Sequence, residues 1–76
     1  MKAADEIDKL TKQLNDGSLP ADEPLFTLRA RDLLAPSLVE LWADTAEKHG
    51  VNAEKVEEAR RHFDAMVAWP ESRLPD

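Results

Sequence analysis

The sequence contains no cysteine, so neither a disulfide nor a cysteine zinc site can hold this 76-residue chain together. It has only two glycines, too few for a glycine-rich phosphate loop. No apolar run approaches the roughly 20 residues of a membrane span. The segment Met1 to Glu6 also lacks the apolar stretch of a signal peptide. We therefore expect a cytoplasmic protein that uses no membrane, no metal and no other cofactor.

The length of the chain predicts one small domain, which buries only about 60% of the surface that its unfolded form exposes. Such a domain needs very good helix packing, self-association or a bound partner. Sixteen acidic against ten basic residues give a net charge of −6. This sign opposes binding to nucleic acid and favours a basic surface on another protein. An acidic surface also serves solubility alone, and that interpretation stays open.

The spacing of apolar residues predicts three helices, over residues 3–15, 36–49 and 53–69. The first has a narrow apolar stripe and is weak alone, so we expect it to dock on the other two and close the core from outside. Gly17 is suited to end it in a left-handed conformation. Pro36 suits the first position of the second helix, where its missing N–H costs nothing.

The last two helices are separated by about three residues, so residues 32–70 form a helical hairpin that is either antiparallel or steeply crossed. Asn52 is a good cap for the second of these helices, and Pro70 ends it. We expect Trp42 in the core. Trp69 lies at a helix end, where it either serves as a binding hot spot or covers the core.

Residues 25–31 alternate between apolar and polar side chains, which favours an extended segment or short strand, although helical spacing also fits. The sequence offers no second strand to pair with it. A lone strand either lies across the helices as an arm or pairs with another molecule, in which case residues 25–31 mediate a homodimer. Arg29 and Arg31 then flank the interface, or else their charges protect a solvated edge.

The predicted fold class is therefore mainly α, a three-helix domain with one extended segment or short strand between helix 1 and helix 2. The single domain spans residues 1–76. Its parts are an N-terminal helix (1–17), a linker with the extended segment (18–31), the helical hairpin (32–70) and a flexible tail (71–76).

Residues 45–56 resemble a helix-turn-helix DNA-binding motif, with Gly50 at the bend between two helices. In that motif the second helix enters the major groove by its N-terminal end. Here this end exposes Glu54, Glu57 and Glu58, whose carboxylates repel the phosphate backbone. A structural corner is therefore favoured over nucleic-acid binding.

Candidates for catalysis or metal binding are sparse. Glu58 and His62 are four residues apart and can share one helix face, a spacing that permits a metal pair or an acid/base pair. Two ligands do not make a site, and no third one is near in sequence. Ser18 and Ser37 lack the context of a catalytic triad. We therefore expect that the protein is not an enzyme.

Acidic residues form one stripe on the second helix and another on the third. Two such ridges either imitate spaced phosphates or are ordinary solvated faces. Arg60 and Arg61 are expected to pair with acidic residues of their own helix. The candidate protein interface comprises the following residues: Phe26, Leu28, Arg29, Arg31, Glu40, Asp44, Glu47, Glu54, Glu57, Glu58 and Trp69.

Residues 19–36, from Leu-Pro-Ala-Asp-Glu-Pro to Leu-Leu-Ala-Pro, followed by Val39 and Trp42, resemble small uncharacterised proteins encoded in bacterial and prophage genomes. This resemblance implies a genomic setting, in which compact acidic proteins often inhibit a host protein by binding it, as anti-CRISPR proteins do. We therefore expect a non-enzymatic protein-interaction module of this inhibitor type. The alternatives are a small helix-turn-helix-like regulator that binds nucleic acid, and a structural protein.

Overall fold

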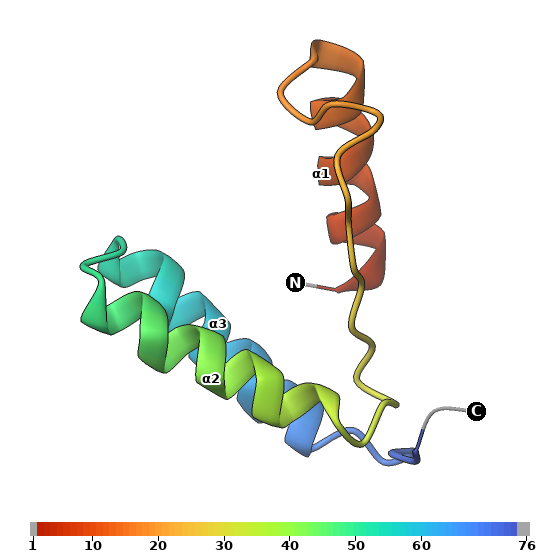
Figure 1. Cartoon of the computed structure of the whole chain (residues 1–76). Coiled ribbons are helices and arrows are strands. Elements are labelled where there is room, and N and C mark those ends of the chain that lie inside the picture. Colours follow the sequence, from red (N-terminus) through yellow and green to blue (C-terminus); the bar gives the residue numbers. More distant parts are fainter. Residues whose placement is uncertain (1, 75–76) are drawn as a thin grey trace.

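The computed structural model describes residues 2–74, which form three α-helices: α1 (Ala3–Asp16), α2 (Ala35–Lys48) and α3 (Ala53–Val67). This confirms the mainly α, three-helix fold that the apolar spacing predicts (Figure 1). Between α1 and α2, residues 24–29 run extended and belong to no sheet (Figure 1), whereas turns and bends make up most of residues 17–23 and 30–34.

Each helix ends where its local sequence offers a stop or a cap. Gly17 follows α1 with a φ of 84°, the left-handed conformation expected of it. The side chain of Asn52 accepts a hydrogen bond of 2.8 Å from the backbone N–H of Glu54, which confirms it as the cap of α3. Ala68 and Trp69 lie beyond the last helical residue, because Pro70 disfavours helical geometry in the residue before it.

The helices α2 and α3 lie side by side and antiparallel, as the two limbs of a hairpin (Figure 1). Gly50 makes the reversal with a φ of 75°. The backbone N–H of Val51 closes the turn by donating to the carbonyl of Ala46 at 3.0 Å. Of the two arrangements that the short connection allowed, the chain adopts the antiparallel one. A helix-turn-helix differs, because its two helices cross at about 90–120°.

The core of the hairpin is small and lies between α2 and α3. Its buried side chains are Ala35, Ala43, Ala46, Val56 and Met66. The residues that α2 contributes are all alanines, so the backbones of the two helices can approach closely. The prediction that Trp42 belongs to this core was wrong, since its side chain is 52% exposed. At 100° per residue Trp42 lies about 40° from Ala46 and about 100° from Ala43, so it stands at the edge of the buried face.

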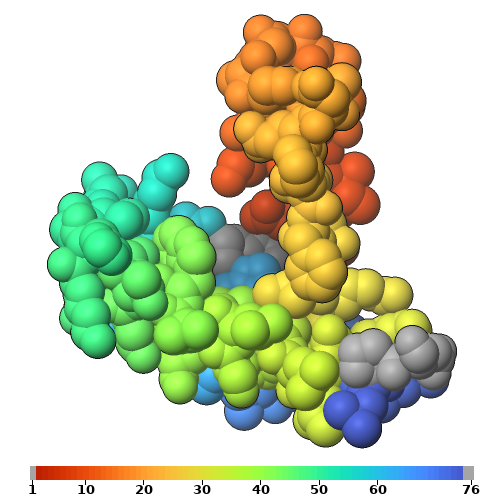
Figure 2. Space-filling view, viewed as in Figure 1, coloured from red at the N-terminus to blue at the C-terminus, as the bar shows by residue number. Residues whose placement is uncertain are grey.

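The expectation that α1 docks on the other helices was also wrong: within residues 2–74, α1 contacts neither α2 nor α3. The chain after α1 turns back and runs alongside it (Figure 1). The backbone N–H of Leu19 begins this return by donating to the carbonyl of Gln13 at 3.1 Å. Residues 2–29, called the N-terminal arm below, stand away from the hairpin arm, residues 30–74 (Figure 2).

The end of the chain is anchored to the start of the hairpin arm. The backbone N–H of Arg73 donates to the carbonyl of Arg31, and the N–H of Leu33 donates to the carbonyl of Arg73, both at 2.8 Å. These bonds form an isolated parallel bridge between Asp32 and Arg73. The flexible tail expected over residues 71–76 is thus held in place at Arg73, and residues 75–76 lie outside the described part.

We expect Ala43→Leu to lower the free energy of unfolding by about 1–3 kcal/mol, because Ala43 is fully buried and a larger side chain there disturbs the close packing of α2 on α3. Urea unfolding followed by circular dichroism measures this change. The control is Ala65→Leu, at an exposed position of α3, which we expect to change stability by less than about 0.5 kcal/mol. Equal effects of the two substitutions would contradict the alanine-based packing.

We expect Gly50→Ala to destabilise the hairpin by about 1–2 kcal/mol, because an L-residue is strained at a φ of 75°. An added Cβ meets no atom within 4 Å, so the cost comes from the backbone alone. Gly50→Asn is expected to cost less, since asparagine tolerates the left-handed region. The same urea titration ranks the stabilities of the variants. If Gly50→Asn were less stable than Gly50→Ala, the loss of stability would not come from backbone strain at this position.

Candidate protein-interaction surfaces

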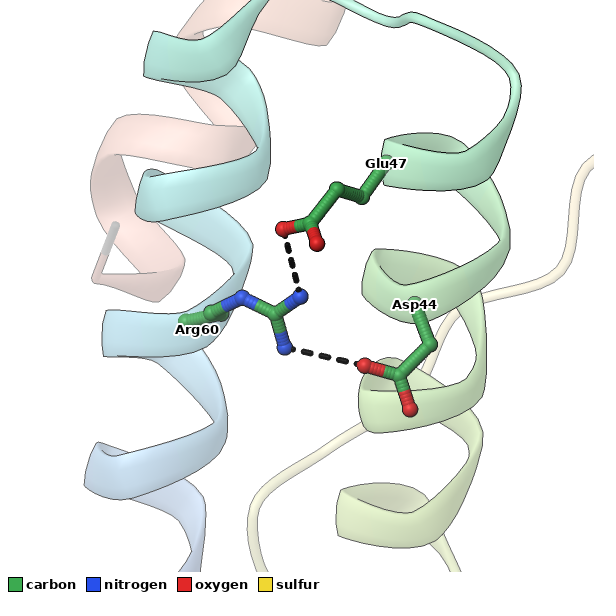
Figure 3. A network of polar contacts seen from close by, with 3 residues as sticks. All are labelled: Asp44, Glu47 and Arg60. Carbon is green, nitrogen blue, oxygen red and sulfur yellow. Dashed lines mark hydrogen bonds and ion pairs between the residues drawn. The ribbon is translucent and has the colours of Figure 1, made fainter.

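The polar contacts of the hairpin centre on Arg60, which reaches from α3 to α2 (Figure 3). Its Nη1 lies 3.0 Å from Oδ1 of Asp44, and its Nη2 lies 3.0 Å from Oε2 of Glu47. The hydrogen bond to Asp44, with that to Glu47, raises the pKa of Arg60 above its ordinary value. The prediction that Arg60 pairs within its own helix was therefore wrong.

This pairing changes which acidic residues face a partner. Asp44 and Glu47 belong to the predicted stripe of α2, but both already bind one guanidinium group. Glu54, Glu57 and Glu58 on α3 are exposed and form no ion pair within residues 2–74. The carboxylates of the α3 stripe are therefore the ones that remain unpaired within the described chain and can attract a basic surface.

A shallow groove of about 320 Å³ runs between α2 and α3, beside the Arg60 cluster. Its lining residues are Glu40, Ala43, Glu57, Arg60, Phe63 and Asp64. Glu40 is thus the one candidate of the α2 stripe that lines this groove without binding Arg60. The groove is lined mostly by charged residues and is open to solvent, unlike the largely apolar pockets that enclose small ligands.

The extended segment, residues 25–28, exposes both its backbone and an aromatic side chain. Its N–H and C=O groups form no hydrogen bond with the described part of the chain. Leu25 lines a hollow against α1, and side chains alternate along extended backbone, so Phe26 points away from α1. Phe26 is 83% exposed, whereas Leu28 is half-buried. Arg29 and Arg31 follow and are both exposed.

Trp69 lies at the base of the hairpin and is half-exposed, as a binding residue requires. Further exposed apolar residues lie on the segments that meet there, where Arg73 joins the chain beside Leu33. They are Leu33, Leu34, Val67 and Leu74. The base of the hairpin therefore remains partly apolar towards solvent.

Sequence reasoning missed a second apolar face on α2. Leu38, Leu41 and Trp42 are all about half-exposed or more, and Leu41 reaches 62%. At 100° per residue they lie on one side of the helix, next to the face that holds the buried alanines. A helical wheel contains this signal, but only the structure shows that α3 packs on the alanine side and leaves the larger side chains uncovered.

The whole chain exposes far more surface than a compact protein of its mass. Its accessible surface is 6276 Å², whereas a folded monomer of this mass exposes about 4,700 Å². Its radius of gyration is 13.6 Å, against about 11 Å for a compact domain of this length. The excess reflects the separation of the two arms.

Residues 2–74 contain no group of three metal-ligating side chains that could hold an ion. The pair predicted from spacing, Glu58 and His62, forms no mutual hydrogen bond. None of the described helices combines the length and the apolar character needed to cross a bilayer.

Comparison with known proteins found no counterpart: no family model matches the chain, and neither the curated proteins nor the solved structures include a significant match.

We expect Arg60→Gln to lower the thermal midpoint, because it leaves Asp44 and Glu47 facing each other without a cation. The difference from the unmodified chain is expected to shrink at 1 M salt, where charges are screened beyond about 3 Å. Thermal unfolding at low and high salt measures it. Arg61→Gln is the control, since Arg61 forms no ion pair within the described residues. A fall in the thermal midpoint that is the same at low and high salt would contradict an electrostatic role of Arg60.

Proposed function

We propose that this chain is a non-enzymatic protein-interaction protein, and that its binding element is the extended segment, residues 25–28. The observation that carries the proposal is Phe26, which is 83% exposed on backbone that has no partner in the described chain. An aromatic side chain in that position leaves a large apolar surface exposed to water unless another molecule covers it. A binding anchor explains why it stands outside any core.

The mode of binding that suits this segment is strand addition. An extended peptide pairs with the open edge of a sheet through its main-chain groups, while alternate side chains enter pockets. Here Phe26 and Leu28 lie on one side of the segment. The partner is therefore a protein with an unpaired sheet edge and an apolar pocket beside it. If the partner also has a basic region, the carboxylates of α3 would contact it and strengthen the binding.

The resemblance of residues 19–36 to prophage-encoded proteins makes a host protein the first partner to test, with inhibition by occupying its surface. Binding of nucleic acid is less well supported. The helices of the hairpin lie side by side, and the end of α3 that would face a groove exposes Glu54, Glu57 and Glu58. These carboxylates oppose contact with phosphate.

Affinity capture from a lysate of the encoding organism tests the proposal. The immobilised chain is compared with Phe26→Ser and with Val67→Ser, which removes an exposed apolar side chain from the other arm. We expect one protein to be captured by the unmodified chain and by Val67→Ser. Phe26→Ser is expected to bind the purified partner about 30-fold more weakly, the size of effect that a hot-spot residue has.

The outcomes that contradict the proposal are equally concrete. A partner that both serine variants retain would show that Phe26 is not the anchor. Capture that nuclease treatment abolishes would instead support the alternative of nucleic-acid binding.

A further inference from the structure

We propose that a second copy of this chain covers the outer face of α2, namely Leu38, Leu41 and Trp42, and that the α1 helix of each copy packs on this face of the other. The two surfaces that this exchange would join lie on separate arms of the chain. Both are apolar, and neither has a partner helix within residues 2–74.

The apolar side of α2 is wider than the part that α3 covers. The outer face is the uncovered remainder of that apolar side. Ala35, Ala43 and Ala46 are buried against α3. Leu38 and Trp42 are four residues apart and so lie one above the other, immediately beside the alanines. Because most of the apolar area of α2 is on these larger side chains, the helix is suited to a second helix packed on its outer side.

The stripe of α1 is the complementary surface. Ile7, Leu10 and Leu14 lie on one side of a helix that has 14 residues and no helical neighbour. The returning linker leaves beside them an open hollow of about 300 Å³, and Ile7 remains 65% exposed. An isolated helix of this length is marginal in water, so its stability requires that the stripe be covered.

The position of the extended segment explains why α1 packs on the α2 helix of another copy and not on that of its own chain. It carries α1 away from the hairpin of its own chain, as Figure 1 shows. Pro20 and Pro24 restrict the backbone on the way, because each fixes its own φ and keeps the residue before it out of helical geometry. Two copies related by a twofold axis satisfy both surfaces twice, since each chain supplies one α1 and one α2 face, and the assembly closes.

The exposed area also fits a dimer. Each chain exposes about 1,600 Å² more than a compact monomer of the same mass. If both chains bury this excess, the interface removes about 3,200 Å², within the range of about 2,000–5,000 Å² for obligate homodimers. Phe26 and the hairpin base lie outside the two stripes. The inference is therefore independent of what the extended segment binds, and it differs from a homodimer through residues 25–31.

Sedimentation equilibrium of the full chain measures the first consequence. We expect twice the mass of one 8.5 kDa chain, and a monomer for Leu41→Asp, which places a charge on the proposed interface. Leu41 is exposed in the single chain, so the hairpin itself should keep its helical signal. Ala65→Asp, which adds the same charge to an exposed site of α3, should remain a dimer. A monomeric unmodified chain would overturn the proposal.

A cross-linking experiment then tests which surfaces meet. Because the chain has no cysteine, the double variant Leu10→Cys/Leu41→Cys carries one thiol at the middle of each stripe. Treatment with a short bifunctional thiol reagent is expected to give a covalent dimer on a denaturing gel. Lys12→Cys/Leu41→Cys, with the first thiol about 160° around α1 from Leu10, is the matched control and should react much less.

The other products decide against the exchange. A covalently closed single chain would mean that α1 folds onto its own α2. A dimer by sedimentation that does not cross-link at these positions would place the contact between copies elsewhere. Both results overturn the assignment of α1 to the partner, and neither bears on whether Phe26 binds a host protein.

Discussion

The close packing of α2 on α3 through alanines is the constraint on which the rest of the structure depends. Ala35 and Ala43 are both fully buried in the hairpin. When the small side chains of a helix face its neighbour, the large ones must lie elsewhere, and Leu41 and Trp42 are therefore exposed. The resulting core is small, because it receives few bulky residues. The hairpin is thus short of buried apolar area and rich in exposed apolar area, which is the opposite of a self-sufficient domain.

Electrostatics supports the same contact. Arg60 lies between two carboxylates of α2 and links the two helices on the side of the groove. Since all three groups are substantially exposed, the cluster adds only a small amount to the stability of the hairpin. Its main consequence for recognition is that Asp44 and Glu47 lose much of their attraction for a basic partner. The acidic character of the protein surface is thereby shifted to α3.

The two proposals assign the exposed apolar surface to two different uses. The stripe of α1 borders an open hollow beside the returning chain, the stripe of α2 lies on the hairpin arm, and a second copy can cover both at once. The extended segment offers main-chain groups and one aromatic side chain, which is the chemistry of peptide recognition. A dimer joined through the arms would present two such segments, so that binding of a partner with two sites would gain from their linkage.

The sequence by itself determined the features that depend on neighbours within one or two turns. These are the three helices, the left-handed stop at Gly17, the cap at Asn52 and the end enforced by Pro70, all of which reflect local backbone chemistry. The extended form of residues 25–28 was also predictable from alternation after a proline, whereas the exposure of Phe26 was not. Only the tertiary structure decided which face of α2 meets α3, where Arg60 finds its carboxylates, that Arg73 pairs beside Leu33, and that α1 stands apart. Each of these depends on contacts between residues far apart in the chain. The spacing of apolar residues cannot predict them, because it is the same whichever apolar face of a helix is covered in the folded protein.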